Sequence, residues 1–193
     1  MLSDRDLVLQ LQSGDVHALG ELYDRYNHVV YRTALAITGD ESAAADLLQD
    51  VFLRVHRFSQ RIDPGRPLEP WLYRVTTNLT YTWIKRRKRW LFRPIEEMAE
   101  WFTGNKKNSP SYQIEKDEEW GNVCQAVATL SLRHRVVIVL HYFNDLSIEE
   151  ISDVLDIPIG TVKSRLHYGR LALKKYLETT NDAKLGEVQY EFT

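Results

Sequence analysis

Apolar residues recur at steps of three and four along most of the chain, which is the spacing of an amphipathic α-helix. After a short first helix that ends near Gly14, the longest run extends from Asp15 to Gly39, with Asp15 suited to its start and Gly39 to its end. Almost no stretch shows the alternation of a β-strand. The pattern therefore predicts an all-α fold in two helical domains joined by a linker.

A second run extends from about Glu41 to Phe58 and has one markedly polar face. Its apolar side is expected at Leu48, Val51, Phe52, Val55 and Phe58. Its other side carries Asp46, Gln49, Asp50, Arg54 and Arg57. We expect the apolar side to pack in a core and the polar side to face outward.

A loop rich in proline and glycine, residues 59–69, precedes a third helix predicted over Pro70 to about Trp90. Its buried side is expected at Leu72, Val75 and Leu79. The other positions interleave aromatic residues with polar and basic ones: Trp71, Tyr73, Arg74, Asn78, Tyr81, Trp83 and then the run Lys85–Arg89. This mixture suits single-stranded nucleic acid, because unpaired bases stack on rings while cations follow the backbone. The alternative is that the aromatic residues are core and the basic run is a solvated helix end.

Residues 94–119 are acidic and lack a sustained period, which predicts a linker. Two large apolar residues within it, Trp101 and Phe102, indicate that this linker rests against another surface. A helix from about Glu115 to Leu130 and an apolar core helix from Leu132 to Phe143 follow. The segment after Glu178 is polar, and we expect it to be mobile.

The stretch from Asp145 to Leu177 predicts two helices joined by a tight turn. Ser147 and Glu150 form a capping box at the start of the first helix, and its apolar residues fall on one face. We expect this helix to stop at Ile157, because Pro158 disfavours helical geometry in the residue before it. A second helix begins at Pro158. This arrangement is a helix-turn-helix, whose second helix enters the major groove of DNA.

The second of these helices has one apolar and one polar side. Val162, Leu166, Gly169 and Leu173 share the first, and because glycine in mid-helix costs about 1 kcal/mol, we expect another backbone to approach Gly169. The outward side carries Lys163, Ser164, His167, Tyr168 and Lys174. Hydroxyls and cations at the helix start, on Thr161, Lys163, Ser164 and Arg165, can reach phosphates and base edges. The alternative is an ordinary pair of packed helices with a solvated face.

Composition and charge narrow the possibilities. The 193 residues are 44% hydrophobic and 27% charged, as in a soluble globular protein of one or two domains. No run of about 18 apolar residues predicts a membrane span, and the N-terminus lacks the plan of a signal peptide. A single cysteine, Cys124, excludes an internal disulfide framework and fits the cytoplasm.

The charge is unevenly divided. Residues 1–93 carry 14 Lys/Arg against 11 Asp/Glu, residues 94–119 carry 3 against 7, and residues 120–193 carry 8 against 9. Because phosphate neutralisation supplies most non-specific affinity for duplex DNA, we expect the nearly neutral helix-turn-helix half to need a partner to stay on DNA.

Sequence patterns of common enzymes are absent: a glycine-rich phosphate loop, a Gly-x-Ser-x-Gly elbow and a His-Glu-x-x-His helix. Cys124, His134 and His141 match no common zinc spacing and lack a fourth ligand. We therefore expect neither an enzyme, nor a cofactor, nor a metal site.

Both halves together resemble the extracytoplasmic-function (ECF) sigma factors of bacterial RNA polymerase, the minimal two-domain members of the sigma-70 family. In the first half the resemblance rests on Gly14-Asp15 with Ala18, on DLLQDVFLRV (residues 46–55) and on PWLYRVTTN (residues 70–78). In the second half it rests on LSIEEIS (residues 146–152) and IPIGTVKSRLHYGRLAL (residues 157–173). It implies region 2 over residues 1–93, the linker over 94–119, region 4 over 120–178 and a tail over 179–193.

The resemblance implies a function and residue roles. The protein would bind core RNA polymerase, direct promoter recognition and initiate transcription. The residues that match the surface for the clamp helices of the largest polymerase subunit are Asp46, Gln49, Asp50 and Arg54. Those that match the site for a flipped base of the melted −10 strand are Asp63, Arg66, Tyr73, Arg74 and Asn78. Those that match the −35 duplex contacts are Thr161, Lys163, Ser164, Arg165, His167 and Tyr168. An anti-sigma factor, which usually holds family members, is a further candidate partner.

Three features depart from the family pattern. Tyr168 stands where many relatives have an arginine, the loop IDPGRPLEP (residues 62–70) has two extra prolines and lacks the usual Phe-Arg-Gly start, and the tail has no counterpart in the shortest members. Two other functions stay open from the residues: a stand-alone helix-turn-helix regulator with an N-terminal sensor domain, and an interaction protein that occupies polymerase without initiating. The aromatic and basic helix at residues 70–90 argues against both.

Overall fold

The computed structural model describes residues 2–91 and 118–190, with side chains at 2–87 and 123–179. These residues form eight α-helices, one 3₁₀ turn and no strand. The chain divides into two compact units, residues 1–114 and 115–193. The predicted all-α fold is confirmed, whereas almost all of the expected linker, including Trp101 and Phe102, lies outside the described residues. Within the described ranges, no helix has the length and apolar character to cross a membrane.

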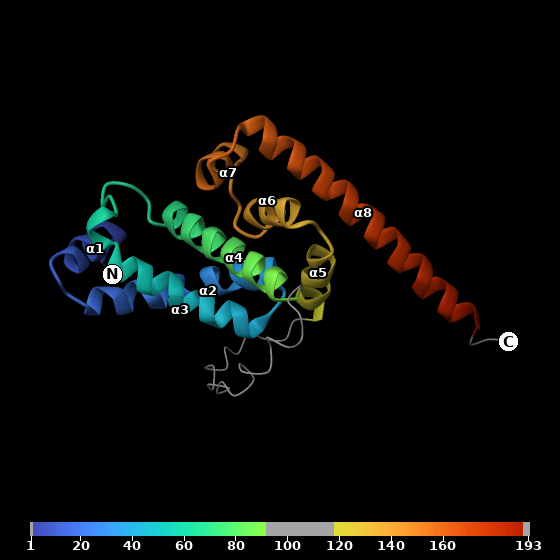
Figure 1. Ribbon diagram of the computed structural model, residues 1–193, viewed down its shortest axis with the longest axis horizontal. Helices are drawn as coiled ribbons and strands as arrows, with labels where there is room; N and C mark the ends of the chain where they lie inside the picture. Colours follow the sequence, from blue (N-terminus) through green and yellow to red (C-terminus); the bar gives the residue numbers. More distant parts are fainter. Residues whose placement is uncertain (1, 92–117, 191–193) are drawn as a thin grey trace. The chain divides into compact units, whose positions relative to one another are not determined.

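The first unit is built around α2 (His17–Thr38), which packs against α1 (Asp4–Gln12), α3 (Glu41–Arg57) and α4 (Glu69–Leu91) (Figure 1). Its core is formed by the apolar sides of the four helices, among them Leu7, Leu22, Val30, Val51 and Leu72. Each fully buried Val or Leu side chain contributes about 1.5–3 kcal/mol. The core therefore supplies the rigid support for the outward faces of α3 and α4.

Local signals set the ends of these helices. Gly39 ends α2 in the left-handed conformation at φ 68°, where a glycine carries no steric penalty. Asp40 caps α3 by accepting a hydrogen bond from the Ala43 amide at 3.0 Å. The predicted cap at Asp15 is shifted by one residue, because Val16 is the N-cap of α2 and Asp15 accepts from the His17 amide at 2.9 Å.

The buried side of α4 differs from the prediction. Leu72 is buried as expected, but Val75 and Leu79 are only partly buried against the core. The fully buried positions are instead Thr76, Thr77 and Thr80. Their hydroxyls donate to carbonyls one turn earlier, for example Thr76 to Leu72 at 2.8 Å and Thr80 to Thr76 at 2.6 Å. Because these hydroxyls are satisfied within the helix, they can be buried at little cost.

The second unit contains α5 (Glu118–Ala128), α6 (Leu132–Tyr142), α7 (Ile148–Leu155) and α8 (Ile159–Tyr190). The predicted capping box is present: Ser147 accepts from the Glu150 amide at 3.2 Å, and Glu150 accepts from the Ser147 amide at 2.8 Å. Helix α7 ends at Leu155, two residues before the predicted end, because Asp156 takes the left-handed conformation at φ 53°. The predicted helix-turn-helix is thus α7, a short turn and α8.

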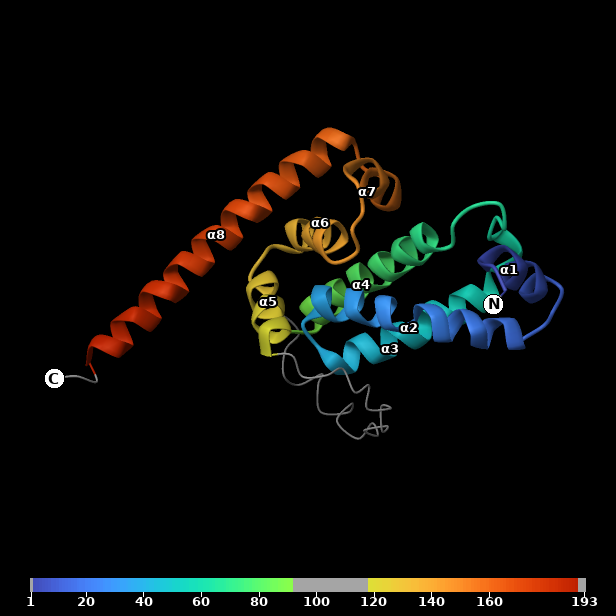
Figure 2. The same cartoon turned by 180° about the vertical axis from the view of Figure 1, so that it is seen from behind.

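Helix α8 is longer than the predicted helix-turn-helix and departs from the prediction at Gly169. It continues to Tyr190, so the polar segment after Glu178, which we expect to be mobile, is helical up to that residue (Figure 2). Its buried Gly169 faces a side chain and not a backbone, because a Cβ at this position would lie 2.9 Å from Cγ1 of Ile138 on α6. Gly169 therefore allows α6 and α8 to pack closely in the described structure.

Candidate nucleic-acid and protein interfaces

The outward face of α3 carries the four polar residues predicted for a protein interface. Asp46, Gln49, Asp50 and Arg54 are all exposed. Leu53 lies on the same face and is 65% exposed, which the sequence analysis missed. The available signal was its position between Asp50 and Arg54 on the polar side of the helix. A large apolar residue among charges is typical of a protein-binding surface, where it contributes buried area at the centre of a polar rim.

The loop between α3 and α4 is anchored at both ends and exposed in the middle. Ile62 and Leu68 are buried, with 4% and 2% of their surfaces exposed. Between them Asp63 accepts a hydrogen bond from the Gly65 amide at 2.9 Å, and its other oxygen lies 3.3 Å from Nε of Arg66. The two predicted site residues are therefore exposed and paired with each other at the tip of the loop.

The exposed side of α4 carries Arg74 and Asn78, four residues apart and thus on one face. Lys85 and Arg86 are exposed further along the helix, while Arg87 pairs with Asp40 at 2.6 Å and lies 5.0 Å from the centre of the Trp83 ring. Helical spacing therefore places the Asn78 amide on the same side of α4 as the cations of Arg74 and Lys85, whereas Arg87 points toward Asp40.

The aromatic residues of α4 follow the alternative interpretation more closely. Tyr73 is only 6% exposed, so its ring offers little surface to a base. Trp71 and Trp83 are partly buried against the core, and Tyr81 is half-buried. The sequence cannot separate these cases, because an aromatic ring at helical spacing fits a core as well as a stacking site.

The start of α8 presents the predicted duplex-binding residues. Lys163, Ser164, His167 and Tyr168 are exposed, and Thr161 and Arg165 are half-buried. Ser164 donates its hydroxyl to the Thr161 carbonyl at 3.0 Å, which leaves its oxygen able to accept a hydrogen bond. All six predicted residues lie within the first ten positions of one helix whose opposite side, including Val162 and Leu166, is fully buried.

A groove beside α8 adds residues that the sequence analysis did not assign. It has a volume of about 740 Å³ and lies between α6 and α8, lined by Arg133, His134, Thr161, Ser164, Arg165, Tyr168 and Lys175 among others. The rings of His134 and Tyr168 stack with centres 6.4 Å apart, and His167 meets Tyr168 edge-on at 5.4 Å. Burial and the nearby Arg133 and Arg165 lower the pKa of His134. Only the packing of α6 on α8 brings Arg133 and His134 to this site.

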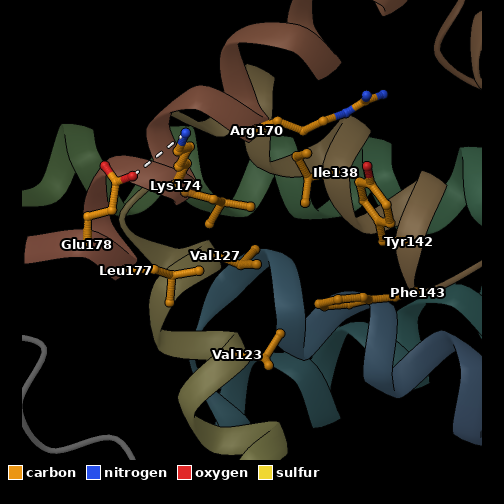
Figure 3. A pocket seen from close by; sticks show the side chains of 10 residues that line it. Val123, Val127, Ile138, Tyr142, Phe143, Arg170, Lys174, Leu177 and Glu178 are labelled. Atoms are coloured by element: carbon orange, nitrogen blue, oxygen red, sulfur yellow. Dashed lines mark ion pairs between the residues drawn. The ribbon is translucent and has the colours of Figure 1, made fainter. Parts of the chain in front are cut away.

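A second groove of about 570 Å³ has a more apolar lining than the first. It is lined by apolar side chains from α5, α6 and α8, including Val127, Ile138, Tyr142, Leu173 and Leu177. Figure 3 shows Lys174 and Glu178 at its edge, joined by an ion pair of 3.7 Å. Arg170 lies 5.9 Å from the centre of the Tyr142 ring. Such a lining suits an apolar protein surface rather than nucleic acid.

The histidines considered as metal ligands have other partners. Nδ1 of His141 lies 2.8 Å from the Leu146 carbonyl, which holds the turn before α7, and His134 belongs to the groove on α8. Among the described residues, no three His, Cys, Asp or Glu side chains are grouped as a metal would require. His141 thus contacts a backbone carbonyl, and His134 lines the groove between α6 and α8.

The comparisons with known proteins agree with this geometry. The family model "Sigma-70 region 2" matches residues 22–90, and "Sigma-70, region 4" matches residues 122–173. The ECF RNA polymerase sigma factor SigW of Bacillus subtilis (strain 168) is 32% identical over 88% of this chain and 94% of its own length. The chain belongs to the ECF sigma factors of the sigma-70 family. It is therefore an RNA polymerase sigma factor that directs transcription initiation. Sigma factors as a family are not enzymes. The alternative function, a stand-alone helix-turn-helix regulator, is not favoured.

Other relatives extend the likeness. The ECF sigma factor SigE of Mycolicibacterium smegmatis is 37% identical over 81% of this sigma factor, which spans 60% of that protein. The solved structure of CnrH in complex with the cytosolic domain of CnrY has a TM-score of 0.66 and 25% identity over 91% of this chain and 97% of that one. The sigma factor RpoE in complex with the anti-sigma factor NepR, from Bartonella quintana, has a TM-score of 0.64 over 82% of this chain and 96% of that one. At 21% identity, this second likeness concerns the fold alone.

Proposed function

We propose that the two units of this sigma factor divide promoter recognition. The first unit holds the polymerase through α3 and takes up a base from the melted −10 strand. The second unit reads the −35 element as duplex. The observation that carries this proposal is the exposure of three polar faces on two well-packed units. The first unit presents the outer side of α3 and the outer side of α4 with its preceding loop, and the second unit presents the start of α8.

The polymerase contact is assigned to Asp46, Gln49, Asp50 and Arg54, together with the exposed Leu53 on the same face. Their partner would be the clamp helices of the largest polymerase subunit, as the family resemblance implies. Charges of both signs beside an exposed leucine support a protein partner over nucleic acid, because phosphates would be repelled by the two aspartates.

The −10 contact is assigned to Asp63 and Arg66 in the loop and to Arg74 and Asn78 on α4. Asn78 can donate and accept hydrogen bonds at the edge of an extruded base. Arg74 and Lys85 supply positive charge along the path of the strand. Because Tyr73 is buried, we assign it to the support of this surface rather than to direct stacking.

The −35 contact is assigned to Thr161, Lys163, Ser164, Arg165, His167 and Tyr168. We add Arg133 and Lys175, which line the same groove and can contact backbone phosphates on either side of the inserted helix. A tyrosine at position 168 is suited to apolar contact with a thymine methyl group, whereas the arginine of many relatives suits guanine. This difference predicts an altered −35 preference.

The division is tested with reconstituted holoenzyme. Loss of one good base contact costs about 1–3 kcal/mol, or roughly ten- to a hundredfold in binding. Asn78→Ala should impair discrimination at one −10 position and slow promoter opening, while closed-complex formation through −35 stays nearly intact. Lys163→Ala should weaken recruitment instead. Arg133→Ala should weaken recruitment equally on all −35 sequences. It should also reduce the slope of log K against log salt concentration by about one, the value of one phosphate contact.

Footprinting of closed complexes and permanganate reactivity of opened DNA separate these effects. If Asn78→Ala abolished the closed complex, or opened every −10 variant normally, the proposed division would be wrong. The domain limits of residues 1–93 and 120–178, the cytoplasmic location and the anti-sigma partner stay predictions. The last can be checked by co-expression with the product of an adjacent gene, which should reduce transcription from a dependent promoter.

A further inference from the structure

The end of α1 is connected to the base of the loop between α3 and α4. The side-chain amide nitrogen of Gln12 donates to the Ser59 carbonyl at 3.0 Å and to the Ile62 carbonyl at 2.8 Å. In return, the side chain of Gln60 donates to the Gln12 carbonyl at 2.6 Å. We call these three hydrogen bonds the Gln12 clasp. They join segments almost fifty residues apart in sequence, as the position of α1 beside the turn between α3 and α4 shows (Figures 1 and 2).

The clasp lies directly before the loop proposed to bind the −10 strand. Residues 59–61 form a 3₁₀ turn, and Ile62 is the first residue after it. From this point the chain leads through Asp63 and Arg66 to the buried Leu68 and into α4. Holding the carbonyls of Ser59 and Ile62 therefore fixes the direction in which the loop leaves the core.

Attachment of α1 to the domain does not depend on the clasp. Leu7, Val8 and Leu11 bury the apolar side of α1 in the core, with at most 5% of their surfaces exposed. At the other end of α1, Asp4 accepts hydrogen bonds from Arg25 and from the Tyr26 hydroxyl on α2. Because these contacts already hold α1 in the domain, the main effect of the clasp is to fix the position of residues 59–62.

The chemistry of the clasp requires a glutamine-like side chain. Both hydrogens of the amide nitrogen are used, one for each carbonyl, and a carboxylate of the same length has no hydrogen to donate. Gln12 also lies outside residues 22–90, the part of the chain that matches the region 2 family model. The clasp thus joins a segment outside the family match to residues 59–62 within it.

We propose that Gln12 is a positioning residue for −10 recognition, acting through the clasp to hold the loop of residues 62–68 ready for the extruded base. This inference rests on the proposed role of that loop. A loop already held in its binding geometry loses less conformational freedom when the base arrives, and small displacements of a positioned group lower reaction rates steeply.

The test uses full-length protein in reconstituted holoenzyme. Gln12→Met keeps the length of the side chain and removes both donors, and Gln12→Glu replaces them with a carboxylate. Gln10→Met makes the same chemical change on α1 away from the clasp. Arg25→Ala weakens the other attachment of α1 without touching the clasp. Promoter opening is measured on a set of single-base −10 variants, with a 2-aminopurine probe at the extruded position.

Both Gln12 variants should slow opening by about tenfold and reduce discrimination among −10 variants, because the loop is no longer held in place. Core binding and −35 recruitment should stay unchanged, and Gln10→Met and Arg25→Ala should retain normal −10 discrimination. Amide hydrogen exchange provides a second measurement on the free protein. The amides of Ile62 and Arg66, which bond to Ser59 and Asp63 within this segment, should exchange faster in the Gln12 variants alone.

The inference would be overturned if Gln12→Met behaved like Gln10→Met, or if it lowered core binding and all promoter activity to the same extent. Asn78→Ala separates this result from failure of the proposed function. If Asn78→Ala alters −10 discrimination and Gln12→Met does not, the clasp has no positioning role. If neither alters it, the assignment of the −10 site is wrong as well.

Discussion

Gly169 illustrates how a single atom limits the packing of the helix-turn-helix unit. A Cβ at this position would meet Cγ1 of Ile138 at 2.9 Å and Cδ1 at 3.2 Å. Cγ1 is close to the backbone of its own residue, so it cannot move away as freely as the end of a long side chain. The glycine therefore preserves the contact between α6 and α8 at the expense of helix propensity.

Gly169→Ala should destabilise the second unit by about 1–3 kcal/mol through overpacking, partly offset by about 1 kcal/mol of helix propensity. Urea unfolding, together with hydrogen exchange of the α6 and α8 amides, would measure the change. In an Ile138→Ala background the obstructing atoms are absent, so the same substitution should become neutral or stabilising. A similar loss in both backgrounds would show that Ile138 is not the obstacle.

At the scale of elements, one carboxylate connects the start of α3 to the last part of α4. Asp40 accepts a hydrogen bond from the Ala43 amide at the start of α3 and pairs with Arg87 near the end of α4 at 2.6 Å. The backbone hydrogen bond from Ala43, and then the contact with Arg87, lower the pKa of Asp40 below its ordinary value of 3.8. This stabilisation is present above the ordinary pKa and is lost as the pH falls through the lowered one.

Asp40→Asn should keep the helix cap and lose the ion pair, which lowers the free energy of unfolding by about 0.2–1 kcal/mol at neutral pH. Asp40→Ala should lose about 1 kcal/mol more, because the cap is lost as well. The difference between wild type and Asp40→Asn should shrink as the pH falls below 3.8.

Urea unfolding of the full chain at a series of pH values would measure these differences. Arg87→Met serves as the control, since it should destabilise the wild type more than it destabilises Asp40→Asn, and the difference measures the ion pair. Any loss that remains in the Asp40→Asn background is assigned to the contact of Arg87 with the Trp83 ring. A constant difference between wild type and Asp40→Asn at every pH would rule out the ion pair as its source.

At the scale of the whole molecule, the distribution of charge agrees with a protein that acts only in complex with polymerase. Residues 120–193 carry 8 basic against 9 acidic residues, which is too little positive charge to hold duplex DNA unaided at physiological salt. The polymerase contact on α3 would therefore supply the residence time on the promoter. Binding of polymerase through α3 of the first unit would thus keep the second unit on the promoter long enough to read the −35 element.

Asp50→Arg should weaken binding to core polymerase by about ten- to a hundredfold, because a reversed charge meets its former partner with repulsion. The loss should diminish as salt is raised. Leu53→Ala should weaken binding with little salt dependence. Glu21→Arg makes the same charge change at an exposed position on α2 and should leave core binding unaltered. Unchanged holoenzyme formation by Asp50→Arg, measured with circular dichroism as a folding check, would contradict the assignment of this face.

Much of the architecture could be predicted from local patterns. The capping box of Ser147 and Glu150, the end of α2 at Gly39, and the outward polar faces of α3 and α8 all depend on residues within a few positions of one another. The period of apolar residues defines which side of a helix is buried, and caps define where it begins. For the same reason, the candidate site residues on α3 and α8 could be selected before the fold was known.

The remaining features depend on contacts between distant parts of the chain. Three threonines rather than Val75 and Leu79 occupy the most buried side of α4, because α2 and α3 pack against that side. The threonine hydroxyls only make this burial inexpensive, since carbonyls of the same helix satisfy them. Arg133 reaches the groove on α8 only because α6 packs there, and Gln12 meets Ser59 and Ile62 only because α1 lies beside the turn after α3. Such pairings follow from how helices pack in space, which the periodicity of a single helix does not specify.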